Sequence, residues 1–277
     1  MLKQRIITAI ILISFIGTAL FWLPPTGLAA LFGGLVLIAA WEWAAMAGLS
    51  SVIARLGYAA VIGLLILASA YYSQILTAAP KFELIRDILG VGCLWWAVAL
   101  LWVRGFPASA VIWRAGVMRM LMGALTLVPA WMAIVYLRNH PYGIELIFLV
   151  IGIVAAADIG AYFTGKAWGK SKLAAEVSPG KSWVGFWGGL ISSVSLVITL
   201  WWLFDGGRHS LVAVVAIVVV TALASVLGDL LESMLKRQQG IKDSGRILPG
   251  HGGMMDRLDS MTAAAPVFAL CFLLAGW

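Results

Sequence analysis

The stretch Leu211–Gly228 reads LVAVVAIVVVTALASVLG and runs without a helix breaker into Asp229–Arg237, DLLESMLKR. The first part is uncharged and long enough to cross the hydrocarbon core of a bilayer as a helix. The second part carries two acids and two bases. This stretch predicts a membrane-spanning helix that continues beyond the bilayer as a charged segment.

The rest of the chain repeats this apolar pattern. Its 277 residues are 62% hydrophobic and only 11% charged, whereas about a quarter of the residues in a soluble domain are charged. Apolar runs of spanning length lie at 6–23, 26–47, 56–77, 88–103, 117–137, 144–164, 184–204, 211–228 and 261–277. They are too long and too evenly apolar for the alternating strands of a membrane barrel. We therefore predict an all-α, polytopic integral membrane protein with about nine transmembrane helices, the first of them uncleaved.

The basic residues indicate an orientation. With the N-terminus in the cytoplasm, four Lys and Arg residues fall outside, namely Lys81, Arg86, Arg138 and Arg208, and the other fifteen fall on the cytoplasmic side. This is the bias of the positive-inside rule. The net charge of +7 has the same origin, because the bases lie in loops between apolar runs. We expect the bilayer, and no nucleic acid, as the partner of these bases.

Two cytoplasmic loops carry most of the charge. Residues 165–183 read GKAWGKSKLAAEVSPGKSW, and residues 229–260 read DLLESMLKRQQGIKDSGRILPGHGGMMDRLDS. The first loop is one residue short of a P-loop and follows a membrane helix instead of a strand, which excludes that motif. We expect a first part, 1–137, with about five transmembrane helices, and a catalytic part, 138–277, that contains both loops.

The charged segment after Gly228 has two interpretations. If the helix continues, Asp229, Ser233 and Lys236 lie on one face, and a carboxylate, a hydroxyl and an ammonium there could hold a metal-bound phosphate. The alternative is an ordinary helix end with an i, i+4 ion pair from Glu232 to Lys236 or Arg237.

The second loop combines glycines with carboxylates. Glycines after His251 let backbone N–H groups approach an anion, and Asp256 and Asp259 lie one turn apart at the start of the ninth helix. Carboxylates with phosphate oxygens are ligands that suit Mg²⁺. A helix cap explains one aspartate and leaves the other unexplained. Cationic side chains that could clamp phosphates also lie in this loop: Lys242, Arg246 and Arg257.

Other residues receive narrower interpretations. Gly185 and Gly189 form a GxxxG step for close helix packing. Asp158, inside an apolar run, is expected to face a polar cavity. Glu42 lies between two tryptophans and is interpreted as an interfacial anchor, and Trp95 and Trp96 as interfacial or lipid contacts.

Two regions together are similar to a known family, phosphatidate cytidylyltransferase, also called CDP-diacylglycerol synthase. The first resemblance covers 27 residues, Ser233 to Asp259, and the second lies upstream. The matching positions are Ser233, Lys236-Arg237, Lys242-Asp243, Gly245, Pro249, His251-Gly252-Gly253, Asp256-Arg257 and Asp259, with Asp158, Gly160, Tyr162, Gly165-Lys166, Ser178 and Lys181-Ser182 upstream. Ile159 and Val184 depart from the family pattern, which places any polar role there in doubt.

The resemblance implies a reaction of CTP with phosphatidic acid that gives CDP-diacylglycerol and pyrophosphate, with Mg²⁺ as cofactor. It implies a bacterial inner-membrane location with the site facing the cytoplasm, and it is compatible with a homodimer. We hypothesise that Asp229 and Asp256 bind Mg²⁺, with Asp259 a further ligand or the site of a second cation. The implied substrate contacts are Ser178, Lys181, Ser182, Ser233, Lys242, Asp243, His251, Gly252 and Gly253, and the implied catalytic residues are Lys236, Arg237, Asp256 and Arg257.

The charged residues also allow two rival functions. An alcohol phosphotransferase needs Asp-Gly-x-x-Ala-Arg, but the Asp205-Gly206 pair lies on the opposite side and lacks that continuation. A lipid or ion transporter could use Asp158 and Asp229 as intramembrane binding groups, although the sequence shows no repeated halves. Such a transporter would release no pyrophosphate.

Overall fold

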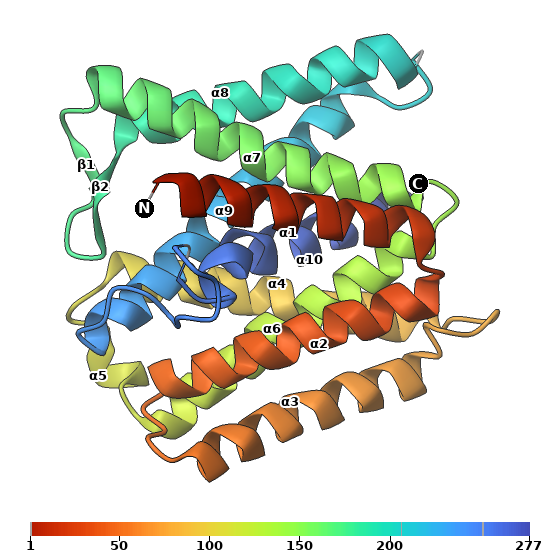
Figure 1. Cartoon of the computed structure of the whole chain (residues 1–277). Coiled ribbons are helices and arrows are strands. Elements are labelled where there is room, and N and C mark those ends of the chain that lie inside the picture. Colours follow the sequence, from red (N-terminus) through yellow and green to blue (C-terminus); the bar gives the residue numbers. More distant parts are fainter. Residues whose placement is uncertain (1, 206, 251) are drawn as a thin grey trace.

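The computed structural model describes residues 2–205, 207–250 and 252–277. Its elements, in chain order, are α1 Leu2–Trp22, α2 Pro25–Met46, α3 Val52–Ser73, α4 Phe82–Arg104, α5 Ala110–Trp113, α6 Gly116–Arg138, α7 Gly143–Trp168, β1 Lys172–Ala174, β2 Ser178–Ser182, α8 Trp183–Leu200, the π-helix η1 Trp201–Asp205, α9 Leu211–Gln238 and α10 Met255–Ala275. The long helices run roughly along one direction and form a bundle (Figure 1).

The polytopic helical fold is confirmed. Within the described residues, eight helices are long and apolar enough to cross a membrane: α2, α3, α4, α6, α7, α8 with the start of η1, α9 and α10. The first expected span, 6–23, falls in α1, whose apolar part is the shorter segment Ile10–Trp22. That span stays a prediction.

The ends of two helices differ from the predicted runs. Helix α10 begins at Met255 and not near 261, and α4 begins at Phe82 and not near 88. An apolar run marks the part of a helix inside the bilayer, whereas the helix itself continues as long as its backbone hydrogen bonds do. Asp256 and Glu83 therefore lie in the first turns of their helices.

The core of the bundle surrounds α6 and α10. Helix α10 packs against α9, α6 and α4. Trp95 and Trp96 lie in this core with 5% and 3% of their surface exposed, so the prediction that they contact lipid is wrong. The indole nitrogen of Trp95 donates to the buried Thr126 hydroxyl at 3.0 Å. Hydrophobicity alone did not separate core from lipid-facing residues, because lipid tails are as apolar as the core.

Helices α7 and α8 form the most extensive helix pair, and they lie side by side along one edge of the bundle (Figure 1). The GxxxG step is confirmed as a packing motif. A Cβ atom on Gly189 would meet the Ala157 carbonyl oxygen of α7, and one on Gly185 would meet the Ala161 carbonyl oxygen. Only glycine lets the two backbones approach this closely.

The loop predicted at 165–183 is partly regular structure. Helix α7 continues to Trp168, and β1 and β2 form an antiparallel hairpin that pairs Lys172 with Ser182 and Ala174 with Ser178. The all-α class therefore gains one two-stranded sheet. The hairpin lies at the same end of the molecule as the charged end of α9 and the start of α1 (Figure 1). The division at 137/138 stays a prediction, and α10 contacts helices of the first part across it.

Candidate active site

The charged end of α9 is a direct continuation of its apolar part. The helix extends to Gln238, as the absence of a helix breaker predicted. The Ser233 hydroxyl donates to Asp229 Oδ1 at 3.1 Å, which confirms that these residues share a face. The i, i+4 pair of the alternative interpretation is present too, because Lys236 Nζ lies 2.6 Å from Glu232 Oε2.

Lys236 joins α9 to α10. Its ammonium lies 2.7 Å from Asp256 Oδ1 as well as contacting Glu232. The Glu232 side chain is fully buried, and the side chains of Lys236 and Asp256 are 13% and 8% exposed. Buried charges are stable only when they are paired and hydrogen-bonded. One lysine between two carboxylates thus holds the two helices together at the polar end of the bundle.

Asp256 also organises the loop that precedes α10. Its Oδ2 accepts hydrogen bonds from the Gly253 N–H at 2.8 Å and the Ser244 N–H at 3.0 Å. The loop turns back through Gly252, whose φ of 82° favours glycine, and the Leu248 N–H donates to the Gly252 carbonyl at 2.9 Å. The loop geometry therefore depends on the same carboxylate that pairs with Lys236.

The β-hairpin docks on α9 through two contacts. Lys181 Nζ lies 2.7 Å from Asp229 Oδ2, and Arg237 Nε donates to the Val177 carbonyl at 3.2 Å. The two charged loops predicted from the sequence are thus brought together. Ser178 opens β2, and the Ser182 hydroxyl caps α8 by accepting from the Gly185 N–H at 3.1 Å.

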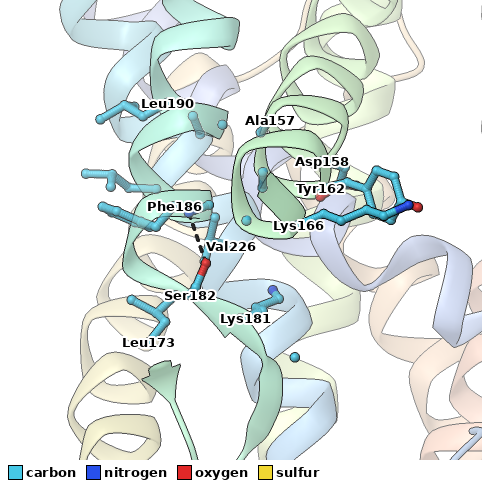
Figure 2. Close-up of a pocket in the computed structure, with 17 residues that line it drawn as sticks. Ala157, Asp158, Tyr162, Lys166, Leu173, Lys181, Ser182, Phe186, Leu190 and Val226 are labelled. Carbon is cyan, nitrogen blue, oxygen red and sulfur yellow. Dashed lines mark hydrogen bonds between the residues drawn. The ribbon is translucent and has the colours of Figure 1, made fainter. Parts of the chain in front are cut away.

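A cavity of about 360 Å³ lies between α7, α8, α9 and the hairpin. Figure 2 shows Lys181 and Ser182 on the hairpin side of it and Asp158, Tyr162 and Lys166 on α7. The remaining lining is largely apolar and includes Phe186, Leu190, Leu223 and Val226. The cavity can therefore accommodate a molecule with one charged and one apolar part.

The cavity and the charged cluster are neighbours. Asp158 interacts electrostatically with Lys181 and Asp229. Asp229 in turn interacts with Asp259 of α10, whose Oδ1 accepts the Ser260 N–H at 2.7 Å. Carboxylates of α7, α9 and α10 thus lie near one another, and Lys181 of the hairpin pairs with the one on α9. Asp158 does line a cavity, as expected, but the walls of that cavity are only partly polar.

Other predicted residues lie in more open positions. Lys242, Asp243 and Arg257 are exposed around the loop between α9 and α10. Gly252 and Gly253 lie against Asp256 and Ser244 respectively. His251 lies outside the described residues. Direct contact of these residues with a substrate stays a prediction.

The carboxylates constrain how a divalent cation could bind. Within the described residues, no three His, Cys, Asp or Glu side chains are grouped to hold a metal ion. Asp229 and Asp256 each contact a different lysine. Mg²⁺ commonly uses one or two carboxylates and takes its other ligands from waters and phosphates. Each aspartate offers a carboxylate for a site of that kind, whose other ligands would be waters and phosphate oxygens.

Sequence reasoning missed the role of Glu42 in this region. Glu42 of α2 is 2% exposed and contacts the loop before α10 through Ser244 and the Met255 N–H. Its interpretation as an interfacial anchor is wrong, because an anchor would reach the bilayer surface. The sequence held one signal for this role. A carboxylate inside an apolar span is costly, so Glu42 could be expected to have a buried partner.

Paired lysines and carboxylates lie at one end of the spanning helices, beside a cavity with polar and apolar walls. This arrangement suits a membrane-embedded enzyme that acts on charged groups. A model of the cytidylyltransferase family matches residues 3–275. The chain therefore belongs to the cytidylyltransferase family, as the resemblance predicted.

Relatives are similar over nearly the full length. The phosphatidate cytidylyltransferase of Pseudomonas aeruginosa is 42% identical over 277 residues, which cover 100% of this chain and 99% of the relative. The Haemophilus influenzae phosphatidate cytidylyltransferase is 39% identical, with 97% and 98% of the two chains covered. The corresponding Brucella suis protein is 34% identical, with 97% and 92% covered.

Proposed function

We propose that this enzyme transfers the cytidylyl group of CTP to phosphatidic acid and yields CDP-diacylglycerol and pyrophosphate. The observation that carries the proposal is the full-length similarity to phosphatidate cytidylyltransferases. The site agrees with this chemistry, because two anionic substrates require cationic groups and a lipid substrate requires a site on spanning helices. Lys181 and Lys236 are such groups, and both lie at the end of the bundle.

The reaction is a substitution at phosphorus. A phosphate oxygen of phosphatidic acid attacks the α-phosphorus of CTP, and the bond from that phosphorus to the oxygen bridging to the β-phosphate breaks. Pyrophosphate leaves with the bonding electrons. Such a transfer depends mainly on positioning and charge stabilisation.

The lysines support substrate binding by exchanging partners. In the structure Lys181 pairs with Asp229, and Lys236 pairs with Glu232 and Asp256. A phosphate presents more negative charge and more acceptor oxygens than a carboxylate, so it competes for the same ammonium groups. We assign Lys236, Arg237 and Arg257 to the triphosphate and the leaving group, and the hairpin residues Ser178, Lys181 and Ser182 to the nucleotide.

The loop residues complete the proposed site. In this proposal the substrate phosphates lie near Ser233, Lys242 and Asp243. The phosphate pocket is shaped by the segment His251, Gly252 and Gly253. The cavity beside α7 and α8 is positioned to receive part of the lipid, because apolar side chains such as Phe186 and Leu190 line it.

We take the divalent cation to be Mg²⁺. It would be held by Asp229 and Asp256 together with substrate phosphates. Asp259 offers a carboxylate for a second cation. When bound, the cation neutralises charge on the triphosphate. The aspartates fix its position, and the lysines neutralise the phosphate charge that remains.

The topology and the bacterial sources of the relatives support a proposal for the setting of the enzyme. It is an integral membrane protein with multiple spans, and we place it in the bacterial inner membrane with the lysine-rich end facing the cytoplasm. CTP is a soluble nucleotide, and this orientation gives it access to the site. A homodimer is compatible with this arrangement and stays a prediction.

The test is release of pyrophosphate by purified protein in detergent with CTP, phosphatidic acid and Mg²⁺. We expect release only when both substrates are present, and its loss when EDTA removes the cation. A transporter of the kind considered from the sequence would release none. Folded protein that forms no pyrophosphate with several divalent cations would contradict the proposal.

A further inference from the structure

Glu42 is a buried carboxylate that comes from a helix outside the charged cluster. It lies near the end of α2, and only 2% of its surface is exposed. Its Oε2 accepts the Met255 N–H at 2.8 Å and the Ser244 hydroxyl at 3.2 Å. Among the described residues, its Oε1 has no hydrogen-bond partner. A carboxylate this deeply buried is costly unless it is paired or hydrogen-bonded, so its two donors, Ser244 and Met255, are needed to hold it there.

The loop between α9 and α10 is shaped around this carboxylate. A Cβ atom on Gly245 would collide with the Glu42 side chain, and one on Gly253 would collide with both Glu42 and the Ser244 hydroxyl. Glycine at these two positions therefore has a second explanation besides close approach to a phosphate. The loop needs room for a carboxylate that arrives from the first part of the chain.

Glu42 and Asp256 hold the same loop residue from two sides. Ser244 gives its hydroxyl to Glu42 and its N–H to Asp256. Met255, the residue before Asp256, gives its N–H to Glu42. The start of α10 has no side-chain cap from its own N-cap residue, Met254, so Glu42 serves as a cap supplied from another helix.

We infer that Glu42 is a positioning residue for the reaction, which orients Asp256 and the loop 239–254 through Ser244 and Met255. Glu42 is not among the described residues that line the cavity, and its hydrogen bonds go to Ser244 and Met255, so it acts through these partners. The expected change in activity rests on the proposed function. The expected change in the loop rests on geometry alone. Groups that orient a metal-binding or reacting residue change activity or metal affinity by about 10- to 100-fold when they are removed.

The test compares purified wild type with Glu42→Gln, Glu42→Ala and Ser244→Ala. Thr126→Val is the matched control, because it removes a buried hydrogen bond between α4 and α6, two helices outside the loop. We expect amide hydrogen exchange in 239–254 to accelerate in the three test variants and to stay unchanged in the control. We expect kcat to fall about 10- to 100-fold in Glu42→Ala, less in Glu42→Gln, and the Mg²⁺ concentration needed for half-maximal activity to rise.

Combining the substitutions sharpens the test. If Glu42 acts through Ser244, Glu42→Ala with Ser244→Ala will lose little more activity than Glu42→Ala alone. If Glu42→Ala does not fold, Glu42→Gln and Ser244→Ala still carry the comparison. Unchanged exchange in 239–254, or a fall in activity that only parallels the loss of thermal stability seen in Thr126→Val, would overturn the inference. Wild type that forms no pyrophosphate would remove the proposed function and leave the exchange comparison valid.

Discussion

Lys236 is the side chain on which the charged cluster depends. It lies between Glu232, whose side chain is fully buried, and Asp256, whose side chain is 8% exposed. Each carboxylate needs this cation to offset the loss of hydration. The same ammonium is the natural partner of an incoming phosphate, so a residue that stabilises the fold also binds substrate in our account.

Lys236→Met separates these two roles. The substitution leaves two buried carboxylates without a cation, and we expect a loss of about 3–5 kcal/mol of stability together with loss of activity. Adding Glu232→Gln removes one of the two unpaired charges, so part of the stability should return while activity stays absent. Thermal unfolding in detergent and pyrophosphate release measure the two effects.

Asp87→Asn is the control, since Asp87 pairs with Arg86 at an exposed position, where such a pair contributes only about 0–1 kcal/mol. If Lys236→Met unfolds at the wild-type temperature, the cluster does not stabilise the helix ends. If the double variant is active, Lys236 does not bind substrate.

At the scale of elements, the pairing of α7 with α8 sets one wall of the cavity. Gly189 lies directly against the Ala157 carbonyl, and both residues line the cavity. Any separation of the two helices would widen the cavity and move the hairpin that carries Lys181. The glycines of α8 therefore connect helix packing to the position of a proposed substrate contact.

Gly189→Ala tests this connection. The added methyl group has no room and should destabilise the protein by about 1–3 kcal/mol, with lower activity as α8 shifts. In α4, Gly90→Ala is the matched control, because a Cβ atom there has nothing within 4 Å and alanine favours a helix by up to about 1 kcal/mol. The measurements are the unfolding temperature and the activity of each variant. Equal values for the two variants would contradict the proposed link between helix packing and the cavity.

The elements also show what sequence could predict. Uninterrupted apolar runs located the spans, and the absence of a breaker after Gly228 predicted the charged extension of α9. The hairpin at 172–182 was missed because its strands are three and five residues long and lie in a charged segment without alternation. Trp95 and Trp96 were misplaced because the sequence gives no hydrophobic contrast between lipid and core.

At the scale of the whole molecule, the site joins segments that are far apart in the chain. The segments that meet at one end of the bundle lie near residues 42, 158, 181, 230 and 256. The family resemblance covered the last four of these segments. Glu42 lay outside the matched motifs, and its partners Ser244 and Met255 contribute generic hydroxyl and backbone groups. Pairings of this kind depend on how the helices are arranged in space, which local sequence patterns do not encode.

The proposed reaction moves a cytidylyl group from CTP to the lipid. The most direct measurement uses CTP labelled at either the α- or the γ-phosphate, with phosphatidic acid, Mg²⁺ and purified protein. Our account predicts that α-label enters the lipid fraction, that γ-label stays in the aqueous fraction as pyrophosphate, and that EDTA stops both changes. Label from the γ-phosphate in the lipid, or no α-label there with folded protein, would contradict it.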